Sequence, residues 1–451
     1  MAGDTGWSNW AGNQSVDGIA VTRPRGTDEI ARAIADARRA ERRIRPIGSG
    51  HSFTGIGRPD TGAGRLDTVQ LRLDRHADLV HFDGATGQVT VQAGMPLHRL
   101  NVLLQHAGRA LTNLGDIDVQ TVAGAFSTGT HGTGARFGGL ATQIRGLSLV
   151  LADGSVLNCS ATSHVDVFRS ARVGLGSLGV ISTVTLQTEP AFVLHAEEGP
   201  AELADVLASF DELADGTDHF EFYWFPHTTR TLTKRNMRVS PEILNPLPRW
   251  RSWLGDEFLS NTVFGGLVAA GRRAPRLVRP LNQLAARALG SRSYSDLSHR
   301  VFTSPRRVRF VEMEYAIPRA SLVPVLSELR RTVDASTWNI AFPVEVRVAA
   351  ADDITLSTAF GRDSAYIAVH VPLGAPDQEA YFGTLERLAG EVGGRPHWGK
   401  LHGLDAAILR ARYPRFDEFV ALRDRLDPDG MFANEYLDRV LGPPVAARSV
   451  A

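Results

Sequence analysis

The sequence contains one cysteine, Cys159, and this scarcity limits the kinds of site that the chain can build. A single cysteine cannot form a disulfide within the chain, and it excludes a zinc site made of several cysteines. No run approaches the roughly 18 apolar residues of a membrane-spanning helix, so none is predicted. The first residues lack a basic start followed by an apolar stretch, so no secretory signal is predicted. These absences indicate a cytoplasmic protein.

The chain also lacks an excess of either charge, because 49 Lys+Arg balance 49 Asp+Glu. A nucleic-acid binder usually presents a net basic face, so the balance argues against nucleic acid as a partner. Lysine itself is nearly absent: Lys234 and Lys400 are the only two. A lysine retained where arginine dominates suggests a need for a compact point charge, although chance explains either lysine alone.

The 451 residues suffice for two or three domains, and the texture of the sequence changes near residue 189. Before that point, hydrophobic periodicity predicts strands over 19–24, 43–47 and 89–93 and helices over 27–40 and 97–107. After it, aromatic residues cluster, and further strands are predicted over 308–315, 344–348 and 365–371. The pattern predicts an α+β protein.

An Arg-rich stretch runs from Arg272 to Arg309. Such a stretch could bind a membrane surface or an anion. Acidic residues balance the charge elsewhere in the chain, which favours the simpler interpretation of a solvated helical face with surface loops.

A glycine cluster from Gly174 to Gly179 matches the G-x-G-x-x-G pattern of dinucleotide-binding sites. That site needs a strand before the glycines and a helix after them. Here the sequence predicts a helix over 166–172 and a strand over 180–186. The order is reversed, so we predict that this segment does not bind NAD.

A second cluster, Gly48-Ser49-Gly50, follows the strand predicted over 43–47 and precedes His51. Small residues allow successive backbone N–H groups to turn toward one point, which forms a nest for phosphate oxygens; an ordinary tight turn is the alternative. A long run of small and hydroxyl residues, from Thr121 to Gly134, suits a backbone that lies flat against a large ligand. His51 and His131 lack the spacing of a metal site, so no metal is predicted.

Together these segments resemble the flavoproteins of the vanillyl-alcohol oxidase type, and within them the aldonolactone oxidoreductases. The resemblance extends from about residue 7 to 440 and is weakest over about 240–300. The matching motifs occur in the family's order and are Trp7-Ser8-Asn9-Trp10, Gly50-His51-Ser52, Asn113-Leu114-Gly115, Val122-Ala123-Gly124, Gly129-Thr130-His131-Gly132-Thr133-Gly134, the segment 171–179 and Arg395-Pro396-His397-Trp398-Gly399-Lys400.

The resemblance implies an FAD-binding domain of two α+β subdomains and a cap domain built on an antiparallel sheet. The implied boundaries are 1–188 for the FAD-binding domain, 189–398 for the cap, 399–441 for a segment that returns to the FAD-binding domain and 442–451 for a tail.

FAD is the implied cofactor, carried covalently by His51 through the 8α-methyl carbon of the flavin ring. The motifs and the resemblance together give the expected cofactor-binding residues, which are Pro46, Ile47, Gly48, Ser49, Gly50, His51, Ser52, Gly115, Thr121, Ala123, Gly124, Ser127, Gly129, Thr130, His131, Gly132, Gly134, Gly179, Val180, Ile181 and Lys400.

Four residues are the expected catalytic set. Glu345 and Arg347 alternate on one predicted strand and so share a face, which by itself is typical of a structural ion pair. The resemblance implies that they lie over the flavin, where Arg347 would stabilise charge on the substrate oxygen and Glu345 would bind hydroxyls or assist proton removal. Lys400 would lie beside the flavin's reactive nitrogen. His370 is the fourth candidate, and a buried structural histidine is an equal interpretation.

The implied activity is FAD-dependent oxidation of an aldono-1,4-lactone, such as L-gulono-1,4-lactone, to an ascorbate-type product. Oxygen, a cytochrome or a quinone would accept the electrons. The alternative is an alditol or sugar oxidase on the same scaffold, which would act on an open-chain polyol. A non-catalytic flavin- or sugar-binding protein would bind FAD but leave it oxidised with every such substrate.

Overall fold

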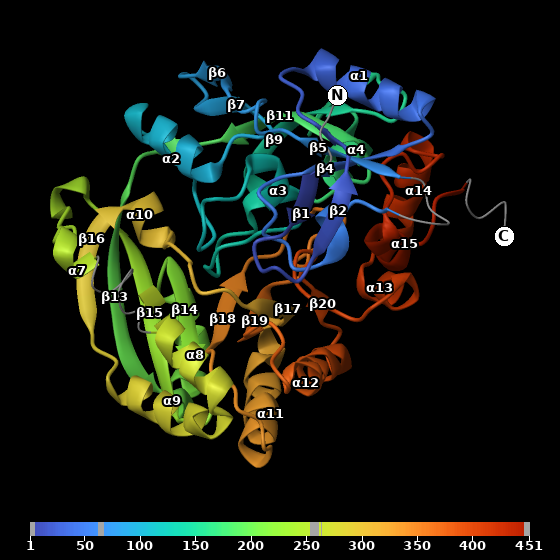
Figure 1. Cartoon of the computed structure of the whole chain (residues 1–451). Helices are drawn as coiled ribbons and strands as arrows, with labels where there is room; N and C mark the ends of the chain where they lie inside the picture. The colour runs from blue at the N-terminus through green and yellow to red at the C-terminus, as the bar shows by residue number, and fades with distance from the viewer. Residues whose placement is uncertain (1–4, 62–66, 253–260, 263, 446–451) are drawn as a thin grey trace.

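The computed structural model describes residues 5–61, 67–252, 261–262 and 264–445. In Figure 1 the elements of the first 190 residues lie above one long sheet, and the last helices return to their side. The chain therefore builds two layers, and its first and last described elements belong to the same layer.

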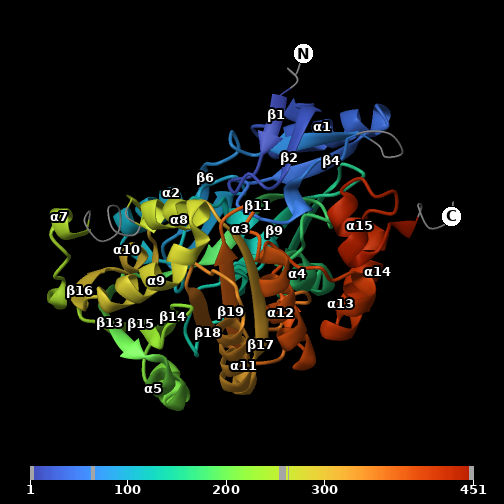
Figure 2. The ribbon, with the colours of Figure 1, turned by 60° about the horizontal axis from the view of Figure 1, so that its bottom comes forward.

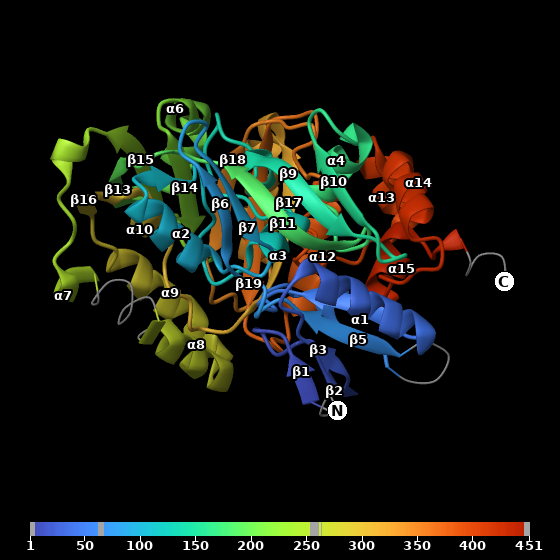
Figure 3. The ribbon, with the colours of Figure 1, turned by 90° about the horizontal axis from the view of Figure 1, so that it is seen from above.

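The two largest sheets of the upper layer, bordered by two pairs of short strands, have different strand directions. The smaller is parallel and pairs β3 (Val21–Thr22), β5 (Thr68–Arg72) and β4 (Arg43–Ile47). The larger is antiparallel and runs in the order β10 (Val156–Ser160), β9 (Ile144–Val150), β11 (Val180–Gln187), β7 (Gln88–Gln92) and β6 (Leu79–Asp83). Helix α1 (Thr27–Arg39) buries Ile30 and Ile34 in the core of this layer. Figure 3 shows the helix from above, beside β5.

Shorter elements connect and border these sheets. They are β1 (Thr5–Ser8), β2 (Ser15–Ile19), α2 (Leu97–His106), β8 (Arg109–Ala110), α3 (Val122–Ser127), α4 (Val165–Ala171) and β12 (Glu189–Pro190). Because α4 precedes the glycines of 174–179 and β11 follows them, the helix–turn–strand order predicted for that segment is confirmed.

The lower layer is an antiparallel sheet of eight strands. In pairing order these are β16 (Arg292–Leu297), β13 (Val193–Glu202), β15 (Arg230–Val239), β14 (His219–Trp224), β18 (Val344–Ala349), β19 (Ser364–Val371), β17 (Val311–Pro318) and β20 (Arg395–Pro396). Around it lie α5 (Leu203–Ala208), α6 (Phe210–Asp215), α7 (Arg249–Ser252), α8 (Phe264–Arg273), α9 (Val278–Arg287) and α10 (Ser298–Phe302).

The central strands of this sheet have one apolar and one polar face, because side chains alternate along a strand. Phe222, Val346 and Ile367 lie in one row and join a core that includes residues of α11 (Leu322–Ala335) and α12 (Gln378–Glu391). Figure 2 shows these helices beside β17 and β19. The neighbouring row, with Tyr223 opposite Glu345, belongs to the polar face. That face is turned toward the upper layer and positions the charged residues described below.

The last helices complete the upper layer. These are α13 (Ala406–Arg412), α14 (Phe416–Leu426) and α15 (Glu435–Leu441), and Figure 1 shows them beside the first elements of the chain. Phe419 and Leu437 share a core with Ile44, and Ile44 N donates to Met431 O at 2.9 Å. The domain boundaries at 188, 398 and 441 stay predictions, but the two cores divide the chain between these layers.

Two predicted strand ranges differ from the structure by more than one residue at an end. The segment 19–24 is divided between the end of β2 and β3, and the strand predicted over 308–315 begins only at Val311 and runs to Pro318. Phe310 does not pair in β17; its ring instead packs against Phe53 and Trp10, with centroids 5.7 and 5.3 Å apart. The ring of Phe310 also packs against Phe342 and His370, so it lies in an aromatic cluster next to the start of β17.

The remaining sequence expectations concern the surface and the tail. Within the Arg-rich stretch, Arg272 and Arg273 at the end of α8 are exposed, whereas Arg292 pairs with Glu198 at 2.8 Å. Of the predicted tail, residues 446–451 lie outside the described residues, and Gly442 O accepts from Arg423 Nη1 at 3.0 Å. None of the described helices has the length and apolarity needed to cross a membrane.

Candidate active site

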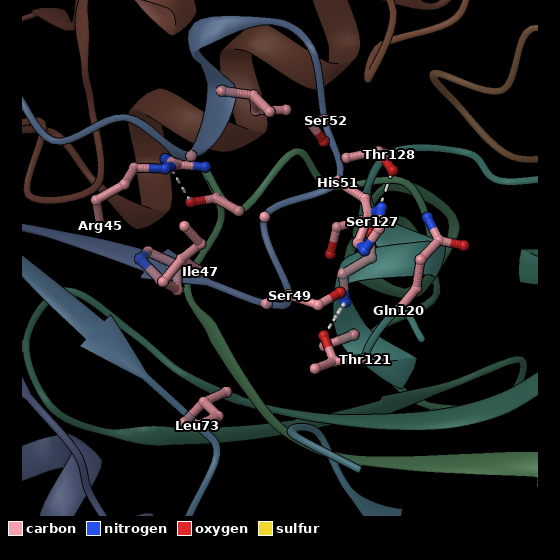
Figure 4. Close-up of a pocket in the computed structure, with 18 of the residues that line it drawn as sticks. Arg45, Ile47, Ser49, His51, Ser52, Leu73, Gln120, Thr121, Ser127 and Thr128 are labelled. Carbon is pink, nitrogen blue, oxygen red and sulfur yellow. Dashed lines mark hydrogen bonds between the residues drawn. The ribbon is translucent and has the colours of Figure 1, made fainter. Parts of the chain in front are cut away.

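A cavity lies between the loop after β4 and helix α3 (Figure 4). Its volume is about 880 Å³, including the solvent-filled space at its open side. The predicted cofactor residues that line it are Pro46, Ile47, Gly48, Ser49, Gly50, His51, Ser52, Thr121, Ala123, Gly124, Ser127, Gly179 and Ile181. Sequence reasoning missed the other lining residues, which are Trp7, Arg45, Thr54, Ile56, Gly57, Leu73, Gln120, Thr128, Leu175 and Gly176.

The amino-terminal segment holds the loop of residues 48–53 by donating hydrogen bonds to carbonyl groups of that loop. Trp10 N donates to Gly50 O at 2.8 Å, and Asn9 Nδ2 donates to Ser52 O at 2.9 Å. Gly50 adopts a φ of 73°, which a residue without a side chain adopts freely. The carbonyl groups of Gly50 and Ser52 therefore accept hydrogen bonds from the amino-terminal segment, and these bonds do not use the N–H groups of the loop.

The backbone N–H groups of residues 49–52 donate to no protein acceptor among the described residues. Gln120 Oε1, on the α3 side of the cavity, is buried without a partner in the described structure. Ser49 is exposed and residues 50–52 are half-buried, so their N–H groups are open to a ligand in the cavity. A series of such backbone donors suits phosphate oxygens. The residues present therefore fit the pyrophosphate of FAD.

The side chain of His51, within this loop, has an aromatic neighbour. The ring of Trp10 stacks on it, with centroids 5.5 Å apart and planes 25° from parallel. Burial, reinforced by the charge of Lys400, lowers the pKa of His51 to about 4. The imidazole is thus neutral at neutral pH, which leaves a ring nitrogen with a free electron pair.

The other predicted cofactor residues lie outside this cavity. Where the run 129–134 leaves the upper layer, Gly134 N donates to Val348 O at 3.0 Å, and His131 Nε2 lies 3.1 Å from Glu314 Oε1. Their contribution to cofactor binding stays a prediction. These residues are Gly115, Gly129, Thr130, His131, Gly132, Gly134, Val180 and Lys400.

Three carboxylates surround Arg347 on the polar face of the long sheet. Its Nη2 lies 2.5 Å from both Asp116 Oδ1 and Glu345 Oε1, and its Nε lies 2.9 Å from Glu221 Oε2. These shortest contacts fall on Nη2 and Nε, both of which are buried without a well-aligned hydrogen bond in the described structure. They leave Nη1 as the candidate donor for another partner.

The three carboxyl groups around Arg347 differ in the direction in which their pKa values are shifted. Burial raises the pKa of Glu345 above its ordinary range, although Arg347 opposes the shift. Burial by itself would also raise the pKa of Asp116, but the charges of Arg347, Arg306 and Lys234 together hold it well below the ordinary range. The pKa of Glu221 is lowered by Arg347 and Lys234 despite its burial. Glu345 is therefore the carboxyl of the three that accepts a proton most readily.

A second charged group lies on the same face around Lys400. Its Nζ pairs with Glu312 Oε2 and lies 5.2 Å from the centre of the Phe53 ring. Burial disfavours the ammonium form, but Glu312 and Glu314 raise the pKa of Lys400 above its ordinary value. Glu345 contributes to the same shift, so this group and the one around Arg347 interact.

His370 lies at the edge of the Lys400 group. Its Nε2 is 3.6 Å from Glu312 Oε1, and its Nδ1 is 3.2 Å from Pro343 O. The structure thus brings all four predicted catalytic residues into one neighbourhood. Their roles stay predictions.

Two sets of side chains in the described residues are close enough together to ligate a cation. Asp116, Glu221 and Glu345 form one set, but the guanidinium of Arg347 already lies among them. His131, Glu314 and His397 form the other, and His397 Nδ1 accepts from Gly399 N at 3.0 Å. Protein groups therefore account for the positions of both sets.

Four charged residues of the Arg347 group had no assigned role from the sequence: Asp116, Glu221, Lys234 and Arg306. Lys234 Nζ lies 3.0 Å from Glu221 Oε1, and Arg306 pairs with Asp116. The scarcity of lysine marks Lys234 as unusual, and it lies opposite Glu221 on the neighbouring strand. For Arg306, which belongs to the Arg-rich stretch, no signal in the sequence indicates this contact.

The fold and the cofactor cavity define the class of the protein. A model described as an FAD binding domain matches residues 19–160. The structure aligns with cholesterol oxidase from Brevibacterium sterolicum at a TM-score of 0.83, covering 98% of this chain and 97% of the other at 17% identity. The predicted fold is confirmed: this is an FAD-binding protein of the vanillyl-alcohol oxidase type with an antiparallel cap sheet.

The relatives narrow that class. A model described as D-arabinono-1,4-lactone oxidase matches residues 184–440. The chain is 44% identical to an L-gulono-1,4-lactone dehydrogenase of Mycobacterium tuberculosis, covering 97% of this chain and 99% of the relative. It is 34% identical to bovine L-gulonolactone oxidase, over 96% and 98%. The chain belongs to the D-arabinono-1,4-lactone oxidase family, as the sequence motifs predict, and is an FAD-dependent oxidoreductase that acts on CH–OH groups.

Proposed function

We propose that the protein oxidises an aldono-1,4-lactone, such as L-gulono-1,4-lactone, at the hydroxyl-bearing carbon next to the lactone carbonyl. The lactone-oxidising relatives motivate the substrate class, and Arg347 carries the proposal structurally. The shortest contacts of the three carboxylates fall on its Nη2 and Nε, and we assign Nη1 as the donor to the substrate. That donor suits an oxygen on which negative charge develops.

The chain's own residues would divide the chemistry. FAD, when bound, supplies the hydride acceptor. Arg347 Nη1 would orient the substrate oxygen. Glu345 would take the proton of the substrate hydroxyl while hydride leaves the carbon that carries this hydroxyl. The raised pKa of Glu345 suits this task, because it brings the carboxylate closer in basicity to the group that it deprotonates. Lys400 would supply positive charge that favours acceptance of the hydride. With L-gulono-1,4-lactone, the released product would rearrange to ascorbate.

We also propose that His51 carries FAD through a covalent bond. The neutral imidazole belongs to the loop whose N–H groups are unpaired, and the ring of Trp10 stacks on it. Flavin should therefore remain with the polypeptide after acid precipitation. His51→Ala should still bind FAD but release it into the acid supernatant, because the phosphate-binding N–H groups remain. Complete release of flavin from the wild type would contradict the covalent bond.

Alditol oxidation is the second candidate, because the chain is 31% identical to a Streptomyces alditol oxidase over 97% of its length and 99% of the relative. The deciding experiment mixes the purified holoenzyme, without air, with a panel of aldonolactones and alditols. We expect the visible flavin absorbance to bleach with the lactones. Faster bleaching with open-chain alditols would favour the second candidate, and no bleaching with any of them would indicate a non-catalytic protein.

A further inference from the structure

Two buried glutamates of β17 lie beside the proposed site without a part in the proposed reaction. Glu312 and Glu314 are alternate residues and so point to the same face of the sheet. They are only 5% and 6% exposed. Buried carboxylates are costly unless they are paired, so each of them needs a partner cation or donor.

The two glutamates have different partners, although the same segment of chain runs beside both. Leu401 N donates to Glu312 O at 2.9 Å, and His397 N donates to Glu314 O at 3.0 Å. The side chain of Glu312 pairs with Lys400 Nζ, whereas that of Glu314 faces His131 Nε2 at 3.1 Å. Only Glu312 is in contact with the lysine.

We propose that Glu312 is a positioning residue that keeps the Lys400 ammonium charged and in place beside the reaction site. This inference rests on the proposed function, in which the charge of Lys400 assists hydride transfer. A buried ammonium without a paired carboxylate tends to lose its proton, and a long flexible side chain without a fixed partner samples several positions. The contact with Glu312 opposes both tendencies.

The surroundings of Lys400 contain both signs of charge. Glu312 and Glu314 from β17 and Glu345 from β18 favour its ammonium form. Histidines lie near it on other segments, and the aromatic ring of Phe53 lies under the ammonium. The titratable groups that face this neighbourhood are Glu312, Glu314, Glu345, His51, His370 and His397. Glu312 is the one carboxylate among them that the structure places in ion-pair contact with Lys400.

The presence of only two lysines allows a direct test. Holoenzyme labelled with carbon-13 at the ε-carbon of lysine should give two side-chain NMR signals, and a Lys234→Arg variant assigns them. We expect the titration midpoint of Lys400 to move to lower pH in Glu312→Gln. Lys234 should not move, and Glu314→Gln, the matched control on the same strand, should move Lys400 less. An unchanged Lys400 midpoint in Glu312→Gln, or an equal shift in Glu314→Gln, would overturn the inference.

The midpoint potential of the bound flavin is the second measurement. In the wild type, a plot of the midpoint potential against pH should show no change of slope caused by Lys400 between neutral pH and about pH 10. In Glu312→Gln, deprotonation of Lys400 should introduce such a change of slope. If Glu312→Gln does not fold, the wild-type titration decides: a Lys400 midpoint at or below that of an ordinary lysine, about 10.4, overturns the inference. The NMR titration needs no substrate, so a failure of lactone oxidation leaves this test intact.

Discussion

Arg347 and Lys400 are two buried cations on the same polar face, but they are held in different ways. Arg347 has three carboxylate partners, and they come from a loop of the upper layer and from strands β14 and β18. Lys400 has one carboxylate in contact, Glu312, and a cluster of histidines nearby. The first cation is clamped between layers, and the second is attached to a single strand.

This difference matches the chemistry of the two side chains. A guanidinium presents several N–H groups in one plane, so two of its nitrogens can be engaged while the third keeps a defined direction. An ammonium is a compact point charge and defines no such plane. We infer that Arg347 supplies direction to the proposed reaction, whereas Lys400 supplies charge.

The largest expected effect comes from removing either cation. Arg347→Ala should slow anaerobic flavin reduction by about 10²–10⁴-fold, because it removes the donor for the substrate oxygen. Lys400→Ala should slow it by at least about a hundredfold, with flavin content near normal in both. Stopped-flow reduction measures the rate, and a thermal melt is recorded in parallel. A merely structural role would lower the melting temperature and leave the rate of the folded enzyme nearly unchanged.

Exchanging the two cation types should separate direction from charge. Arg347→Lys should lose nearly as much rate as Arg347→Ala, because one ammonium cannot contact three carboxylates and still present a fixed donor. Lys400→Arg should keep its rate within about tenfold of the wild type, since the positive charge remains. Each variant is compared with its alanine counterpart at saturating lactone. Equal losses in the two exchanges would show that both positions need the same property.

The smallest expected effect concerns acid stability on the Lys400 side. Burial lowers the pKa of His397 to about 4, below the ordinary value of about 6.5. Between these values the unfolded chain binds a proton that the folded chain does not, so stability falls as the pH falls. His397→Gln should reduce the loss of unfolding free energy between pH 7 and pH 5 by about 1–2 kcal/mol. Urea unfolding at both pH values tests this, and an equal loss in variant and wild type would contradict it.

The sequence predicts the loop of 48–52 and the pair on β18 because neighbouring residues carry both signals. Small residues in succession indicate a phosphate nest, and alternation places Glu345 and Arg347 on one face. The partners of Arg347 could not be predicted in this way. Asp116 and Glu221 are separated from it by more than a hundred residues, and only the packing of two layers brings them together.

The same limit applies to the cofactor cavity. Arg45 lines it and donates to Leu175 O at 2.6 Å and to Phe432 O at 2.7 Å, so one side chain connects three distant segments. Alternation along β4 alone gives no sign of these acceptors. The glycines of 174–179 match the pattern of NAD-binding sites. The helix before them and the strand after them argue against such a site. Two of them, Gly176 and Gly179, do line the cavity.

The bond from Arg45 to Phe432 has a consequence for the order in which the protein folds. The side chain of Arg45, which lines the cavity, is held by a carbonyl that lies 387 residues further along the chain, and α15 follows that carbonyl. Closing a loop of that length costs entropy that is recovered only when the two distant segments have packed against each other. We therefore expect this part of the cavity to form late in folding, after the local sheets and helices.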